Sequence, residues 1–235
     1  MCGRFTLQIP PELLAEIFGL LEIPVYPARY NISPTQKIAV IRQNGDGQNR
    51  FGFLHWGFIP SWANDSSVGN SMINARSETV HEKPTFKNSV RYKRCLIPAS
   101  GFYEWLQEEN TKIPMYIRLK DEPLMALAGL WEKSKSPEGG YIESCAILTT
   151  HANKLIEHIH DRQPVILHQE EFKLWLDKEI VDPEVLAHLF HPYPADRMEM
   201  YPVSQKVNSP RNESAELIKP LDVKDNCFEY SPKKR

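Results

Sequence analysis

The chain begins Met1-Cys2-Gly3, and the second residue is the one best suited to chemistry. A small residue after the initiator methionine normally allows that methionine to be removed, and Cys2 would then carry a free α-amine beside its thiol. Such a 1,2-aminothiol captures an aldehyde, because the amine forms a Schiff base and the thiol closes on the imine carbon to give a thiazolidine ring. An α-amine with a pKa near ~7.7 and a thiol with a pKa near ~8.5 are both partly nucleophilic at neutral pH. Cys2 could equally be an ordinary cysteine, so an acid, a base and a binding place for the aldehyde are required elsewhere.

Glu104 is the first candidate for the acid. It lies between Tyr103 and Trp105 in a segment that reads as a strand, and strand alternation places it on the same face as Phe102. A carboxyl group among aromatic rings loses solvation, which favours its protonated form and lets it donate a proton. The alternative is a glutamate on the exposed face of a strand, and the shared face with Phe102 favours the catalytic interpretation.

Four further polar residues could assist this chemistry. His160 ends a helix predicted over residues 152–160, where its imidazole could move protons near neutral pH or simply cap the helix. Asn74 could hold the N-terminal amine or a sugar oxygen. Arg76 and Arg162 carry planar guanidinium groups that suit phosphates, although an ion pair with a carboxylate is the commoner use of a single arginine.

These side chains need a scaffold of short strands. The run Asn44-Gly45-Asp46-Gly47 indicates a hairpin between strands at 37–42 and 50–56, and Pro11 opens a helix that continues to Leu20. Further strands are expected at 94–98, 101–106, 114–119, 124–131, 141–150 and 202–207, and further helices at 85–92, 152–160, 169–176 and 183–190. Short strands with helices around them predict an α+β fold whose core is a strongly curved, barrel-like and mostly antiparallel sheet.

The composition narrows the class of protein. The chain has 235 residues, of which 41% are hydrophobic, and it contains neither a membrane-spanning apolar run nor a signal peptide, so we expect one cytoplasmic domain. The four cysteines form no C-x-x-C pair, so no metal and no cofactor is expected. Residues 1–120 carry 14 Lys and Arg against 10 Asp and Glu, whereas residues 121–235 carry 14 against 20. A polyanion would therefore meet the N-terminal half, unless the asymmetry is ordinary scatter.

Six sequence blocks, in this order and spacing, resemble the SRAP (SOS response-associated peptidase) family. They are Met1–Phe5, Arg29–Pro34, Trp56–Trp62, Ile73–Glu78, Gly101–Trp105 and Ile159–Pro164. The resemblance covers residues 1–222 as a single domain, and residues 223–235 are expected to form a polar, disordered tail. Gln163 departs from the family pattern, in which a long apolar or basic residue is expected.

The resemblance implies a sensor of abasic sites in single-stranded DNA, acting in the response to DNA damage. In this family the cysteine exposed by methionine removal captures the ring-opened sugar aldehyde as a thiazolidine, and this crosslink shields the strand from cleavage. Matched by position, Cys2 is the nucleophile, Asn74 its positioning partner, Glu104 the proton shuttle and His160 the residue that assists ring opening. The implied DNA contacts are Arg4, Arg76 and Arg162 to the backbone, with Trp62 and Trp105 stacking on bases.

The resemblance also implies self-processing peptidase activity limited to Met1, weak lyase activity through the Schiff base, and a monomer that meets the nucleoid when bound to DNA. Two other functions remain open from the residues. An N-terminal-nucleophile amidohydrolase of the glutamine amidotransferase type also begins Met-Cys-Gly, although this chain lacks its sandwich-like strand pattern. A noncatalytic DNA-binding module with an inert Cys2 is the other alternative.

Overall fold

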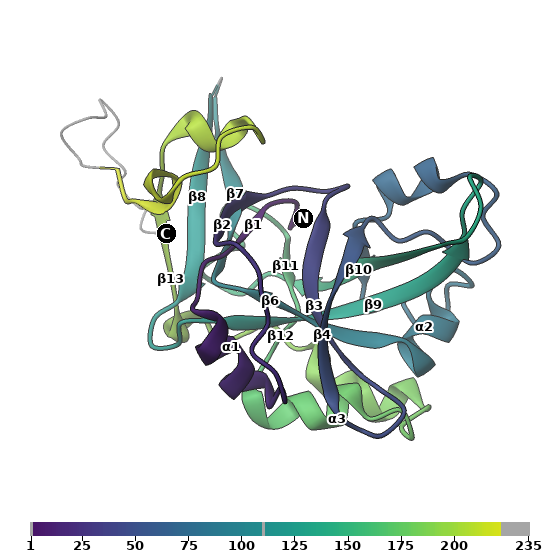
Figure 1. Ribbon diagram of the computed structural model, residues 1–235. Helices are drawn as coiled ribbons and strands as arrows, with labels where there is room; N and C mark the ends of the chain where they lie inside the picture. The colour runs from purple at the N-terminus through teal and green to yellow at the C-terminus, as the bar shows by residue number, and fades with distance from the viewer. Residues whose placement is uncertain (1, 110, 222–235) are drawn as a thin grey trace.

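Five strands close into a small barrel at the centre of the fold. The computed structural model describes residues 2–109 and 111–221, and Figure 1 shows the barrel strands crossing near the centre of the view, below the label of the N-terminus. The barrel strands are β3 (Lys37–Gln43), β4 (Asn49–Trp56), β6 (Arg94–Ala99), β9 (Met125–Lys135) and β10 (Tyr141–His151). Neighbours pair in the order β10-β4-β3-β6-β9, and a further pairing of β9 with β10 closes the ring. Only β4 and β10 pair in parallel, so the ring is mostly antiparallel.

Three short strands extend this sheet around β10 and β9. They are β5 (Asn74–Arg76), β11 (Arg162–Pro164) and β12 (Ile166–Leu167). The register places Thr149 of β10 opposite Arg76 of β5 and also opposite Pro164 of β11. The segment that carries Asn74 and the segment that follows His160 are therefore held on either side of one strand.

A second, antiparallel sheet stands beside the barrel, on the left in Figure 1. Its strands are β1 (Phe5–Leu7), β2 (Arg29–Ile32), β7 (Gly101–Glu108), β8 (Thr111–Leu119) and β13 (Met198–Pro202), in the order β13-β8-β7-β1-β2. Strand β1 pairs with both β2 and β7, with Phe5 opposite Ile32 on one side and Phe102 on the other. The N-terminal segment is thus fixed in the middle of this sheet.

Helices cover the ends of the strands and are short. The α-helices are α1 (Pro11–Phe18), α2 (Lys87–Tyr92) and α3 (Phe172–Leu176). The 3-10 helices are η1 (Ser66–Ser71), η2 (Gln169–Glu171), η3 (Pro183–Phe190), η4 (Ala195–Arg197), η5 (Gln205–Asn208) and η6 (Ala215–Ile218). Helix α1 begins with proline and ends at Gly19, whose φ of 58° is the left-handed conformation that glycine adopts without strain. Phe18 of α1 stacks on Phe172 of α3 with ring centroids 5.2 Å apart, which joins the two helices under the barrel.

The structure confirms the α+β class and the barrel-like, mostly antiparallel core. It also corrects two expected elements. Within the helix expected at 152–160, residues 154–159 form turns, because the side chain of Asn153 accepts hydrogen bonds from the backbone N–H of Leu155 and Ile156. The last strand is β13, and the region expected as a strand at 202–207 passes into η5, where the Ser204 hydroxyl caps Lys206.

The expected tail from residue 223 lies outside the described residues. Within residues 2–109 and 111–221, no helix is long and apolar enough to cross a membrane.

Candidate functional site

Cys2 lies between the two sheets, immediately before β1. It is fully buried and belongs to the main hydrophobic core. Strand β1 belongs to the second sheet, whereas one polar partner of Cys2 comes from β5 on the barrel side: the Asn74 amide nitrogen, Nδ2, donates to the Cys2 carbonyl oxygen at 3.0 Å. The N-terminal residue is therefore held in place from both sheets.

Asn74 keeps one side of its amide available. Its Oδ1 atom is buried and accepts no hydrogen bond from the described residues. A buried acceptor without a partner costs free energy, so this oxygen favours a donor that arrives with the substrate or with a newly exposed N-terminal amine. The geometry suits the positioning of Cys2 by Asn74 that the sequence predicts.

Glu104 approaches the same place from β7. Glu104 is only 5% exposed. Burial, and after it the negative charge of Glu104, raise the pKa of the Cys2 thiol to about 12. The thiol of this form of the chain is therefore protonated at neutral pH, and a carboxyl group stands close enough to influence its proton.

His160 does not end a helix, as the sequence suggested, but precedes β11 in a turn. Its Nδ1 accepts a hydrogen bond from the backbone N–H of Arg162 at 2.9 Å, which places the proton of the neutral ring on Nε2. The same Nδ1 is 2.9 Å from Oδ1 of Asp161, so a protonated imidazole finds a carboxylate beside it. These two contacts fix the orientation of the His160 ring.

Arg4 and Trp105 meet on the second sheet. The Arg4 guanidinium lies 5.8 Å from the centre of the Trp105 ring, and its Nη1 donates to Oδ1 of Asn31 at 2.6 Å and to the Val207 carbonyl at 2.8 Å. The Trp105 indole donates to Oδ1 of Asn208 at 2.7 Å. Both side chains are thus fixed in orientation by the segment around η5.

Arg162 is buried and engaged in an ion pair. It is 5% exposed, and its two terminal nitrogens donate to the two carboxylate oxygens of Glu78 at 2.7 and 2.9 Å. One of them also donates to the Thr149 carbonyl at 2.5 Å. Burial opposes the ionisation of Glu78, but the hydrogen bonds and charge of Arg162 outweigh it and hold the pKa of Glu78 below its ordinary value. In this structure Arg162 orients Glu78 and β10, and its contact with DNA remains a prediction.

Arg76 and Trp62 are the exposed members of the predicted set. Arg76 is two residues beyond Asn74 on β5, so the two side chains share a face, and Arg76 is open to solvent. Trp62 is 65% exposed in the loop between β4 and β5. That loop is closed at its base, where a Cβ on Gly57 would lie 2.7 Å from the Gly69 carbonyl oxygen, so only glycine allows the approach. The loop therefore projects Trp62 from a fixed base.

Sequence reasoning missed the residues that hold the predicted ones. Asn31 accepts from Arg4 and donates to carbonyls of residues 209 and 212, so it ties the N-terminal strand to the C-terminal segment. Glu78 and Thr149 hold Arg162. Asn31 and Glu78 both lie inside blocks that carry the family resemblance, Arg29–Pro34 and Ile73–Glu78, and their place in those blocks was the available signal.

Across residues 2–109 and 111–221, no group of three or more His, Cys, Asp or Glu side chains is arranged to hold a metal ion. Cys2, Cys95 and Cys145 are all free, buried thiols.

Comparison with known proteins shows similarity along most of the chain. A family model described as SOS response associated peptidase (SRAP) matches residues 1–210. The abasic site processing protein YoqW of Bacillus subtilis is 50% identical over 222 residues, which cover 93% of this chain and 99% of that protein. The abasic site processing protein HMCES of Rattus norvegicus is 29% identical over 273 residues, which cover 95% of this chain and 77% of that protein.

The fold has a solved counterpart. A crystal structure of a protein from Bacteroides thetaiotaomicron superimposes with a TM-score of 0.82 at 26% sequence identity, covering 94% of this chain and all of that one. The family model, the half-identical relative and the shared fold agree over the residues that form the barrel and the second sheet. The chain belongs to the SOS response associated peptidase (SRAP) family.

Proposed function

We propose that this protein processes abasic sites in single-stranded DNA by capturing the sugar aldehyde on Cys2. Relatives at 50% and 29% identity are named abasic site processing proteins. The observation that carries the proposal is the arrangement of a fully buried Cys2 with the Asn74 amide on its carbonyl and the Glu104 carboxyl near its thiol. These groups surround the residue whose amine and thiol must act together.

The first steps concern the amine. Removal of Met1, which lies outside the described residues, exposes the Cys2 α-amine, from which the unpartnered Oδ1 of Asn74 is proposed to accept a hydrogen bond. His160 or Glu104 transfers the proton that opens the closed hemiacetal of the abasic sugar. The amine nitrogen then bonds to the aldehyde carbon to form a carbinolamine. Glu104 donates a proton to its hydroxyl, which leaves as water, and an imine remains.

The thiol completes the capture. Its sulfur bonds to the imine carbon, and the thiol proton passes through the Glu104 carboxylate to the imine nitrogen, which becomes the ring amine of a thiazolidine. One aldehyde and one aminothiol thus give one ring and one water molecule. Protonation of the imine nitrogen places a positive charge near the sulfur, which favours the thiolate and offsets the effect of burial.

Ring closure explains why capture would protect the strand. An imine acidifies the neighbouring sugar C–H, and loss of that proton leads to β-elimination and strand cleavage. The thiazolidine has no C=N bond, so it blocks this route. Weak lyase activity is expected only when the thiol is absent or slow.

DNA binding would use the arginine and tryptophan side chains on the face around Cys2. Arg76 is exposed, and Arg4 is half-buried against Trp105 with its Nε–H unpartnered among the described residues. Guanidinium groups fix the phosphate register, and aromatic rings such as Trp62 stack on bases at about 1–3 kcal/mol per base. The positive charge of residues 1–120 has the sign this requires. We further propose that the protein acts as a monomer on DNA in the cytoplasm and that it removes its own Met1.

The test is a crosslinking assay with single-stranded DNA that contains one abasic site. The mature protein is expected to give a band of reduced mobility on a denaturing gel, and Cys2→Ala to give none. Cys145→Ala is the matched control, because Cys145 is also a buried free thiol but lies in the barrel strand β10. No band with the unaltered protein, or an equal band with Cys2→Ala, contradicts the proposal. Release of ammonia from glutamine instead indicates an amidohydrolase.

A further inference from the structure

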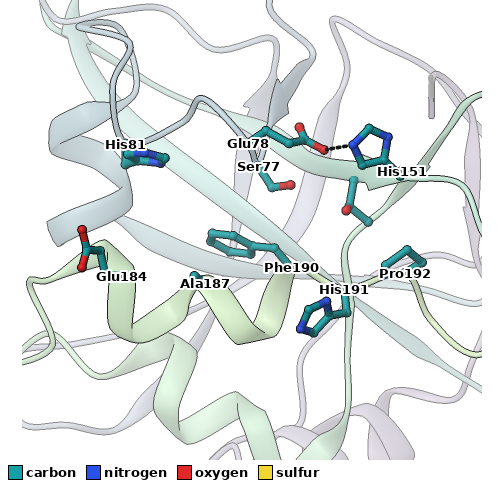
Figure 2. Close-up of a pocket in the computed structure, with 10 residues that line it drawn as sticks. Ser77, Glu78, His81, His151, Glu184, Ala187, Phe190, His191 and Pro192 are labelled. Carbon is teal, nitrogen blue, oxygen red and sulfur yellow. Dashed lines mark ion pairs between the residues drawn. The ribbon is translucent and has the colours of Figure 1, made fainter.

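A cavity of about 400 Å³ lies against η3, where β5 and β10 end. Figure 2 shows Phe190 and Ala187 of η3 on one wall and Ser77 on the other. Glu78 and His151 lie together at the upper edge of this view, joined by an ion pair of 3.3 Å between the Glu78 carboxylate and His151 Nε2. The surface that the cavity exposes is mostly apolar, although seven of its ten lining residues are polar or charged.

The cavity adjoins the proposed DNA-binding face. The register pairs Asn74 with Ile147, Arg76 with Thr149, and Arg162 with His151, so these alternate residues all lie on one face of the sheet. Glu78 follows Asn74 by four residues, a span of at most about 13 Å. Stacked nucleotides of one strand are about 3.4 Å apart, so the cavity is within a few nucleotides of the reacting sugar.

Glu78 joins the cavity to that face. One oxygen of its carboxylate, Oε1, receives Arg162 Nη1 at 2.7 Å and lies 3.3 Å from His151 Nε2. Arg162 is buried on the side of the proposed site, whereas His151 is 75% exposed by its side chain and lines the cavity. A molecule that enters the cavity therefore meets the residue that orients Arg162.

The lining indicates the chemical class of the occupant. The apolar surfaces of Phe190, Ala187 and Pro192 suit the faces of a planar ring, while the hydroxyl groups of Ser77 and Thr150 suit its polar edge. Phe190 is held edge-on against Trp175, with centroids 6.1 Å apart and planes at 80°, so its ring has a fixed orientation. Two carboxylates, Glu78 and Glu184, and the imidazoles of His81, His151 and His191 complete the lining.

We propose that this cavity is a subsite for one nucleobase that flanks the abasic nucleotide in the bound strand. The proposal rests on the proposed function, which brings single-stranded DNA along Asn74 and Arg76. The strand has already lost one base, so a neighbouring base leaves the stack at reduced cost. Stacking on an aromatic side chain accepts any base, so the subsite selects a position along the strand and not a sequence.

The experiment uses a set of single-stranded oligonucleotides, each with one abasic site and with one flanking base replaced by a tetrahydrofuran spacer. The spacer has no aldehyde and no base, so it removes only the stacking group. Crosslinking rate and equilibrium binding are measured for each strand, the binding on matched strands whose central site is also a spacer. A spacer at one position on one side of the abasic site is expected to reduce the crosslinking rate and the binding affinity roughly fivefold to a hundredfold. Spacers at the other positions are expected to reduce both much less.

Two variants of η3 connect this loss to the cavity. Ala187→Trp fills the cavity from an exposed helix position, and Val185→Trp is the matched control on the same helix, where Val185 is 47% exposed and does not line the cavity. Ala187→Trp is expected to lower binding of the unmodified strand as the critical spacer does, and to abolish the further effect of that spacer. Val185→Trp is expected to behave as the unaltered protein, and thermal unfolding of both variants verifies that they fold.

The outcomes separate this subsite from the proposed function. Equal losses at all flanking positions, or an undiminished spacer effect in Ala187→Trp, overturn the subsite while leaving crosslinking intact. If the protein binds the strands without crosslinking, the proposed chemistry is wrong and the binding data still decide the subsite. If Ala187→Trp leaves DNA binding unchanged, the cavity serves some other ligand, such as a partner's aromatic side chain, and the inference is wrong.

Discussion

The amide of Asn74 donates a hydrogen bond of 3.0 Å to the carbonyl oxygen of Cys2, and this contact joins the two sheets at the N-terminus. Asn74 belongs to β5 beside the barrel, and Cys2 precedes β1 of the second sheet. The contact fixes the residue whose amine and sulfur would react. Because the other amide atom, Oδ1, is buried and accepts nothing from the described residues, Asn74 has room for one more interaction at the reacting end.

Asn74→Ala is therefore expected to slow crosslinking by about ten- to a hundredfold, which corresponds to the loss of one or two buried hydrogen bonds. Binding to a strand that carries an unreactive spacer is expected to change much less, because the phosphate contacts remain. Single-turnover gels measure the first quantity and fluorescence anisotropy the second. Asn70→Ala, an exposed asparagine of the preceding loop, is the control. An equal loss in both measurements contradicts a positioning role for Asn74.

Cys2→Ser separates the amine chemistry from the thiol chemistry. The variant retains an N-terminal amine after methionine removal but lacks the sulfur that closes the ring. It is expected to cleave the strand at the abasic site by β-elimination, and borohydride is expected to trap its imine on the DNA. The unaltered protein leaves most of the strand intact. Absence of both cleavage and trapping in Cys2→Ser argues that the α-amine does not attack the aldehyde.

Glu78→Gln tests the buried ion pair with Arg162. Removal of one partner from a buried pair typically costs about 3–5 kcal/mol, but the Glu78 side chain is 36% exposed and Thr149 still accepts from Arg162. We expect a loss of about 1–3 kcal/mol in the free energy of unfolding, measured by urea denaturation. Glu82→Gln, whose side chain is 70% exposed, is expected to change stability by less than about 0.5 kcal/mol. Similar urea midpoints for Glu78→Gln and Glu82→Gln contradict a stabilising role of the ion pair between Glu78 and Arg162.

The buried thiols predict a loss of stability at alkaline pH. Burial raises the pKa of Cys95 to about 12, whereas a thiol in an unfolded chain ionises near pH ~8.5. Between these values the unfolded state has released a proton that the native state retains, so the free energy of unfolding falls as pH rises. The expected slope is about 1.4 kcal/mol per pH unit for each such thiol.

Cys95→Ala removes one of these thiols, so its unfolding free energy is expected to fall less steeply than that of the unaltered protein between pH 9 and 10.5. Urea denaturation at several pH values measures the two slopes. The variant also loses packing in the barrel, which lowers its stability at every pH but leaves the difference in slope. Parallel slopes are the result that this interpretation does not allow.

Local signals in the sequence were sufficient for many elements of the fold. Oδ1 of Asn44 accepts from the backbone N–H groups of Asp46 and Gln48, as expected for the Asn-Gly hairpin between β3 and β4. Local signals also mark the ends of α1, with Pro11 at its start and Gly19 at its C-cap. No local signal predicted the closure of the barrel. Closure depends on the parallel pairing of β4 with β10, which places Trp56 opposite Cys145, a residue far away in the sequence.

Side-chain pairing at long range was the other part that the sequence did not reveal. Arg162 and Glu78 are separated by 84 residues, and only the fold brings β11 and the end of β5 to opposite sides of β10. Gln163, which departs from the family pattern, is fully buried, and its Oε1 accepts from the backbone N–H of Asn153. That bond helps to fix the turn before His160, and a helical pattern in residues 152–160 concealed it.

The most direct test of the central claim is the intact mass of the crosslinked species before and after treatment with borohydride. A thiazolidine on Cys2 predicts the mass of the chain without Met1 plus the mass of the DNA strand, less one water, and no change on reduction because the ring contains no C=N bond. Retention of Met1 in the crosslinked species, or a gain of two hydrogens on reduction, contradicts capture by the amine and sulfur of Cys2 together.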